Sequence, residues 1–149
     1  MKQNKLNTII RDIESKEFAT KHGKDVHARI SKICFCNGDF AGDENIVSKI
    51  KDNPDLCEFM GPLSYAEVPL AGYINGVFLS RRIDRLYVNE KTKTVVVLDY
   101  KTDIDKKVYY EKYCVQLIEY YKLLKEFYPG FNISCKILWL NDFTLENVI

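Results

Sequence analysis

Residues 94–103 read TVVVLDYKTD. The first five are β-branched residues and a leucine, a composition typical of a strand that is buried on both faces. Asp99 and Lys101 follow directly, and charged groups at the end of a buried strand cost free energy unless they are neutralised or used. We therefore treat Asp99 and Lys101 as candidates for a functional site.

Two more strands are predicted just before this stretch, over residues 64–74 and 77–88. Asn75-Gly76 lies between them and is typical of a two-residue type I′ turn, in which both positions need a positive φ. A polar turn at 89–93 then leads into the strand at 94–98. The three strands are expected to form an antiparallel meander.

Helices are predicted on either side of the meander, because apolar residues recur at intervals of three and four. The upstream stripes are Leu6, Ile9, Ile10 and Ile13; Val26, Ile30 and Ile33; and Ile46, Val47 and Ile50. Downstream, a helix over 106–127 is expected to place Val115, Ile118, Tyr121 and Leu124 on one stripe. A last strand is predicted over 133–140.

The expected fold class is therefore α/β (α+β), with a central mixed sheet flanked by helices. The length of 149 residues predicts a single domain, 1–149. Within it, 1–60 is expected to be a helical part and 61–149 a sheet-and-helix core.

The turns also predict which side chains meet. With a two-residue turn at Asn75-Gly76, Glu67 lies directly opposite Asp84, and with a four-residue second turn Asp84 lies opposite Asp99. Lys101 then points to the same face as Asp99, because strand side chains alternate with a period of two. A slip of one residue in the second turn would move Asp99 to the other face.

Three carboxylates in a row across neighbouring strands repel one another unless they are protonated or a divalent cation neutralises them. Carboxylate oxygens suit Mg²⁺ or Mn²⁺. A lysine beside such an ion can orient a water and stabilise charge on a phosphoryl group. The set predicts metal-assisted phosphodiester hydrolysis.

A simpler interpretation also fits the residues taken one at a time. In it, Asp99 and Lys101 form a surface salt bridge, and Asp84 pairs with Arg82 or Arg85. A zinc site at Cys34, Cys36, His22 and His27 is a weaker alternative, because the spacing lacks C-x2-C pairs.

Five segments, in order, resemble one known family. They are Gly23-Lys24-Asp25-Val26-His27, Glu67-Val68-Pro69, Ile83-Asp84-Arg85-Leu86, Leu98-Asp99-Tyr100-Lys101-Thr102-Asp103 and Gln116-Leu117-Ile118-Glu119-Tyr120. Together they resemble the nuclease domain at the C-terminus of RecB and AddA helicase–nucleases, in the PD-(D/E)XK superfamily, whose core is restriction-endonuclease-like. The resemblance covers about Gly23 to Leu140.

The resemblance implies a role for each matched residue. It implies that Lys101 positions the attacking water, that Glu67 supports the metal or a second water, and that Gln116 and Tyr120 lie near the active site and the DNA strand. The implied metal ligands are His27, Asp84, Asp99 and the backbone carbonyl of Tyr100. Helicase domains like those of the best-known members do not fit in this chain, and its cysteines do not reproduce the four-cysteine iron–sulfur arrangement of some relatives.

The expected substrate is DNA, single- or double-stranded, cut without strong sequence specificity. Candidate nucleic-acid-binding residues are Arg82, Arg85, Lys106 and Tyr113. A separately encoded helicase is an expected partner. The alternatives are a restriction-like endonuclease and a catalytically weak or inactive nucleic-acid-binding subunit.

Composition limits the other classes. With 22 basic and 21 acidic residues the formal net charge is +1, which argues against binding nucleic acid by bulk charge alone. No apolar run reaches the ~20 residues of a membrane span, and the N-terminus has no apolar signal segment. Five cysteines without an export signal predict reduced thiols and a cytoplasmic protein.

Overall fold

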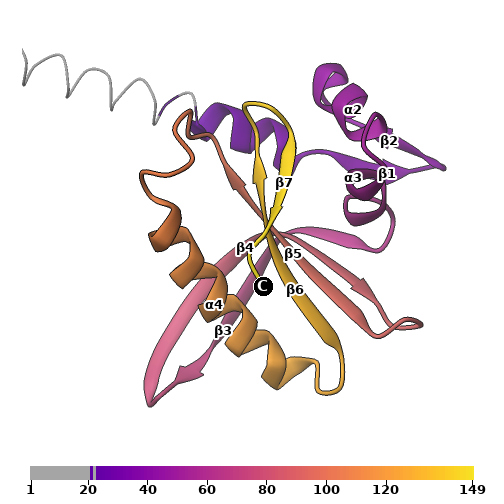
Figure 1. Ribbon diagram of the computed structural model, residues 1–149. Coiled ribbons are helices and arrows are strands. Elements are labelled where there is room, and N and C mark those ends of the chain that lie inside the picture. The colour runs from indigo at the N-terminus through magenta and orange to yellow at the C-terminus, as the bar shows by residue number, and fades with distance from the viewer. Residues whose placement is uncertain (1–20, 22) are drawn as a thin grey trace, which may run out of the picture.

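A five-stranded mixed sheet forms the centre of the computed structural model, which describes residue 21 and residues 23–149 (Figure 1). The strands lie in the order β3-β4-β5-β6-β7. Their bounds are β3 Ser64–Ile74, β4 Val77–Asn89, β5 Thr94–Lys101, β6 Asn132–Trp139 and β7 Thr144–Asn147. β5 and β6 run parallel, and the other neighbours in this sheet run antiparallel. The predicted class, α+β with an antiparallel meander in a mixed sheet, is confirmed.

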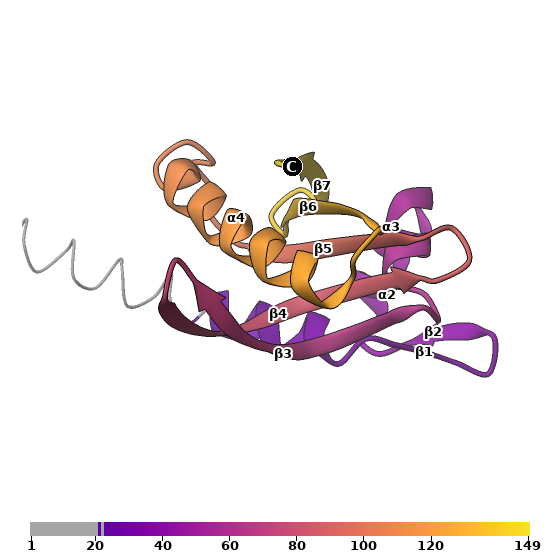
Figure 2. The same cartoon turned by 90° about the horizontal axis from the view of Figure 1, so that it is seen from below.

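Helices cover both faces of this sheet. Along β5, Val95 and Val97 lie in an apolar cluster with residues of α4 (Tyr110–Phe127), whereas Val96 and Leu98 lie in a cluster with Ile30. Figure 2 shows α4 on one side of the sheet and the helix at 23–31 on the other. The α4 face and the opposite face are therefore both buried, as the apolar run at 94–98 predicted.

The part before residue 61 is not all helical, so that prediction is wrong. It contains the helix at 23–31, α2 (Glu44–Lys51) and α3 (Pro54–Phe59), but also a hairpin of β1 (Cys34–Cys36) and β2 (Asp39–Ala41). Its turn is Asn37-Gly38, with φ of 52° and 80°. The same Asn-Gly signal that predicted the turn at residues 75–76 operates here. The helix predicted around Leu6 to Ile13 lies outside the described residues.

The long helix was predicted to begin four residues too early, and only Tyr121 and Leu124 of its predicted stripe pack on the core. It begins at Tyr110, and Val115 and Ile118 of the predicted stripe are 58% and 41% exposed. The buried residues are Leu117, Tyr120, Leu123 and Leu124. Large apolar side chains lie on both sides of the buried stripe of this helix, so helical spacing alone did not identify the face that packs on the sheet.

β4 and β6 match their predicted bounds to within one residue, but β5 and β7 differ from the prediction. β5 continues past Leu98 to Lys101, because β6 pairs with it as far as Lys101 opposite Trp139. β7 was not predicted, since its four residues, TLEN, have neither the length nor the composition of a strong strand signal. None of the described helices combines the length and apolar character that crossing a membrane requires.

Candidate active site

The predicted register of the meander is confirmed. In the first hairpin Val68 pairs with Ile83 and Ala66 with Arg85, and in the second Asn89 pairs with Thr94. The ladder between β4 and β5 ends at Arg85 opposite Leu98. The next position in this register places Asp84 opposite Asp99. The two acids therefore come together where β4 and β5 begin to separate.

Asp84 bridges this separation with its side chain. Its Oδ2 accepts a hydrogen bond of 2.8 Å from the backbone N–H of Tyr100. Burial, and after it the charge of Asp99, raises the pKa of Asp84 to about 7 from 3.8. Removal from water disfavours the charged form of Asp84, and the negative charge of Asp99 adds to this effect.

Asp99 and Lys101 form a buried ion pair on the α4 face. Asp99 is 2% exposed, and its Oδ2 lies 2.7 Å from Lys101 Nζ. The ammonium also donates to Gln116 Oε1 at 3.2 Å and lies 4.4 Å from the centre of the Tyr113 ring. The simpler interpretation, a surface salt bridge, gave the right partner for Asp99 but the wrong environment. Its pairing of Asp84 with Arg82 or Arg85 is wrong, because neither arginine contacts that carboxylate.

Helix α4 supplies the second layer of contacts around Lys101. Gln116 Nε2 donates to the Tyr120 hydroxyl at 2.7 Å, so the amide oxygen of Gln116 is directed at the ammonium. Burial raises the pKa of Tyr120 well above its usual value. Tyr120 is 2% exposed, so it belongs to the core of the site and does not offer a surface to a nucleic-acid strand.

Asp103 joins this layer and was not assigned a role from the sequence. It accepts a 2.6 Å hydrogen bond from the Tyr113 hydroxyl, and burial together with this bond raises the pKa of Tyr113. The ring held in this way is the one that faces Lys101. The available signal was spacing, since Asp103 follows Lys101 by two residues, as Lys101 follows Asp99.

The helix at 23–31 brings His27 to the same place from the opposite face. His27 Nε2 lies 2.9 Å from the carbonyl oxygen of Tyr100. A Cβ on Gly23 would lie 2.9 Å from Thr102 Oγ1, so the glycine allows the helix to approach the end of β5 closely. Two of the implied ligands, from segments 73 residues apart, are thus adjacent.

A divalent cation suits these groups in chemical type. Asp99 Oδ2 is buried and, despite its contact with Lys101, has no aligned hydrogen bond from any described residue. The contact from His27 to Tyr100 is a hydrogen bond in which Nε2 donates to the carbonyl oxygen, so a cation bound by both groups would replace that proton. No three His, Cys, Asp or Glu side chains of residues 21 and 23–149 are already gathered into a metal-binding group. A bound cation would have to draw them together.

Glu67 lies beside the row but is turned outward. Its φ is +55°, the left-handed region that a glutamate rarely adopts within a strand. Its carboxylate pairs with the Arg82 side chain at 3.0 Å. The ladder pairs on both sides keep the same register, so the distortion is confined to Glu67 itself.

The four predicted nucleic-acid-binding residues have different environments. Arg85 is 3% exposed and donates to neutral oxygens on the face opposite α4, so it does not flank the acidic row, and its predicted place beside the scissile phosphate is wrong. Lys106 pairs with Asp142 at 2.7 Å, and Tyr113 faces Lys101. Arg82, whose side chain is 70% exposed, remains open to a ligand.

Comparisons with known proteins give little beyond this geometry. No family model and no curated protein matches the chain. Seven chains among the solved structures match it, one of them described as a crystal structure of SSO0001. That match has a TM-score of 0.43 and 16% identity, and it covers 93% of this chain and 59% of the other. The chain thus spans less than two thirds of SSO0001.

Proposed function

We propose that this protein is a metal-dependent nuclease that hydrolyses phosphodiester bonds of DNA. The observation that carries the proposal is that Asp84, Asp99 and Lys101 lie together on neighbouring strands, with Asp99 buried at their centre. Two acids and an amine at one point, in a region otherwise packed with apolar side chains, cost stability unless they serve a reaction.

The residues of the chain divide the chemistry among them. Lys101 is placed to orient a water and to stabilise negative charge as it develops on the phosphoryl group. Asp99, Gln116 and the Tyr113 ring fix the direction of its ammonium. Restricting the amine in this way keeps the reacting groups in one geometry.

Asp84, Asp99, His27 and the Tyr100 carbonyl would hold Mg²⁺ or Mn²⁺. When bound, the cation supplies Lewis-acid stabilisation of the phosphoryl oxygens. The resemblance of the five sequence segments to RecB- and AddA-type nucleases, with a restriction-endonuclease-like core, supports the same ligand set and DNA as substrate. A separately encoded helicase partner and a cytoplasmic location stay predictions from the sequence.

The test is incubation of the purified protein with end-labelled single- and double-stranded DNA, with Mg²⁺, with Mn²⁺ and with EDTA. We expect cleavage that requires the cation and falls by about 1,000-fold or more in Asp99→Asn and Lys101→Ala. The exposed ion pair between Lys51 and Asp39, at 3.0 Å, offers matched controls. Asp39→Asn and Lys51→Ala make the same chemical changes away from the site and should cut like the parent.

Two results would contradict the proposal. One is cleavage by Asp99→Asn and Lys101→Ala at the rate of the controls. The other is DNA binding without cleavage by the folded parent under every cation tested, which would favour the alternative of an inactive binding subunit.

A further inference from the structure

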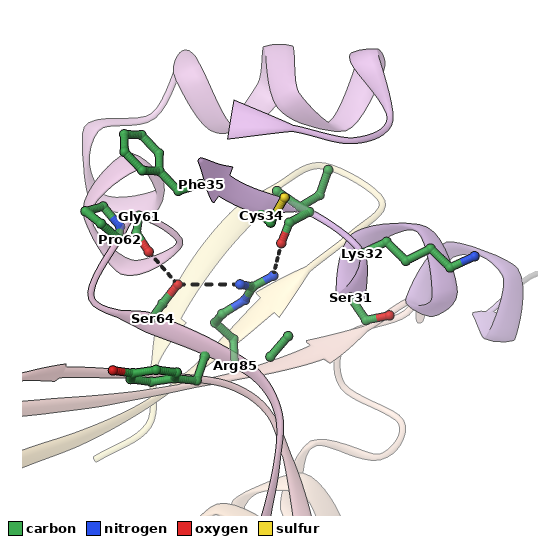
Figure 3. A pocket seen from close by; sticks show the side chains of 11 residues that line it. Ser31, Lys32, Cys34, Phe35, Gly61, Pro62, Ser64 and Arg85 are labelled. Atoms are coloured by element: carbon green, nitrogen blue, oxygen red, sulfur yellow. Dashed lines mark hydrogen bonds between the residues drawn. The ribbon is translucent and has the colours of Figure 1, made fainter. Parts of the chain in front are cut away.

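A pocket of about 340 Å³ lies on the face of the sheet opposite α4. It opens between the end of the helix at 23–31, β1 and the start of β3 (Figure 3). Arg85 forms its floor, and Ser64, Phe35 and Tyr65 contribute to its walls. We refer to it as the Arg85 pocket. Asp84 and Arg85 are consecutive, so their side chains leave opposite faces of β4, and the pocket is separate from the catalytic row.

The guanidinium of Arg85 is a buried cation with no carboxylate partner among residues 21 and 23–149. It donates to the carbonyls of Ile33 at 2.9 Å and Ile30 at 3.4 Å, to the Tyr100 hydroxyl at 3.2 Å and to Ser64 Oγ at 3.5 Å. All four acceptors are neutral. A buried charge normally has a counter-charge, because neutral dipoles replace water only in part.

The neutral contacts leave both charge and donors available. Carbonyls at a helix end carry about half a negative charge in total, so they offset only part of the guanidinium. Of its five N–H groups, those on Nε and Nη2 are used by the Tyr100 hydroxyl and the two carbonyls. Nη1 is the available end, because its contact with Ser64 is too long to be a strong hydrogen bond. In Figure 3 the side chain of Lys32 extends away from Arg85. No acidic residue in the described part of the chain lines the pocket.

We propose that the Arg85 pocket binds a phosphate group, either free phosphate or the phosphate of a small monoester. The charged Nη1 end of the guanidinium is a strong donor for a phosphate oxygen. The Ser64 hydroxyl beside it, which donates to the Gly61 carbonyl at 2.8 Å, can turn to a bound phosphate. The volume exceeds the needs of the anion alone. Phe35 at the wall suits an attached ring. This inference is independent of the proposed nuclease activity.

The test is thermal unfolding of the full chain in EDTA, with phosphate titrated against chloride at equal ionic strength. We expect a saturable rise in Tm of about 2–4 °C when phosphate is at several times its Kd. Adenosine monophosphate distinguishes the two sources. A Kd at least about tenfold lower than that of inorganic phosphate identifies a monoester, and equal values identify free phosphate.

Four variants locate the effect. Ser64→Ala should weaken phosphate binding roughly three- to tenfold, and Ala66→Val, which adds methyl groups directly opposite Arg85 in the register, should weaken it as well. Arg85→Gln, where circular dichroism shows it folded, should abolish the rise. Lys101→Ala is the control, because its amine is the phosphate-seeking group of the other face, and it should keep the full rise.

The proposal is overturned if phosphate gives no rise beyond chloride. It is also overturned if the rise is lost in Lys101→Ala, or if Ser64→Ala and Ala66→Val both bind phosphate like the parent. Ser64→Ala and Ala66→Val keep the test decisive even where Arg85→Gln does not fold.

Discussion

The two faces of strands β4 and β5 bury charge in opposite ways. On the α4 face, Asp84 and Asp99 outnumber the one ammonium of Lys101, which contacts Asp99. On the opposite face, Arg85 stands alone among neutral oxygens, two of them carbonyls of the segment that ends the helix at 23–31. Asp84 and Arg85 are neighbours in sequence, so a single step along β4 separates an acidic centre from a basic one.

This difference shows what each face contributes. Arg85 joins the helix at 23–31 to β4 and to the Tyr100 hydroxyl, and the same helix carries His27 to the Tyr100 carbonyl. Arg85 therefore fixes the helix at 23–31 against the strands that carry the acidic residues. We expect substitutions on the basic face to reduce stability most, and substitutions on the acidic face to reduce turnover most.

The largest effect on stability is expected for Arg85→Gln. The carbonyls of Ile30 and Ile33 and the Tyr100 hydroxyl lose a charged donor while they remain buried, at a cost of about 3 kcal/mol. Urea unfolding measures this loss. Arg82→Gln is the matched control on the same strand, because that side chain is 70% exposed, and it should change stability by no more than about 0.5 kcal/mol. Equal losses in the two variants would show that Arg85 does not anchor the helix.

Substitutions of Tyr113 distinguish two roles for its ring, positioning Lys101 or contacting the nucleic acid. Tyr113→Leu removes the ring that lies 4.4 Å from Lys101 Nζ, and we expect kcat for DNA cleavage to fall about tenfold with little change in KM. Tyr113→Phe keeps the ring, loses only the hydrogen bond to Asp103, and should have the smaller effect. If KM rises instead while kcat holds, Tyr113 contacts the substrate, as the sequence first suggested.

Asp84→Asn should move stability and activity in opposite directions. An amide oxygen can still accept the hydrogen bond from the Tyr100 N–H, and the repulsion with Asp99 disappears. In EDTA we therefore expect the free energy of unfolding to rise by about 1 kcal/mol, while cation-dependent cleavage is lost. Asp105→Asn, on the exposed loop before α4, is the control and should change neither. A destabilised Asp84→Asn protein would show that this carboxylate is part of the frame.

The sequence predicted which residues share a strand face only where a local turn signal set the register. Asn75-Gly76 fixed one turn and strand alternation did the rest, so Asp84, Asp99 and Lys101 were placed on one face correctly. The second Asn-Gly, at residues 37–38, has strands of only three residues beside it. In so short a segment the apolar spacing of a preceding helix outweighed the turn signal.

The contacts that span long separations were beyond the sequence. The role of Arg85 depends on carbonyls 52 and 55 residues earlier, and backbone acceptors leave no mark in residue identity. The inner face of α4 depends on how the helix packs across β3 and β6, because apolar residues occupy more than one of its stripes. Sequence thus predicted which side chains share a strand face, and packing determined what each of them contacts.

The smallest effect tests the strain at Glu67. A glycine adopts its φ of +55° without the steric cost that an L side chain meets, so Glu67→Gly should raise the free energy of unfolding by about 0.5–1 kcal/mol. Glu67→Ala loses the same exposed ion pair with Arg82 but keeps the strained backbone, and it should not be stabilised. Both variants lose the same negative charge. If Glu67→Gly is stabilised and also cuts DNA more slowly than Glu67→Ala, the strained backbone itself is part of the site. If both variants unfold alike, the left-handed conformation carries no measurable strain, and the outward turn of Glu67 reflects only its attraction to Arg82.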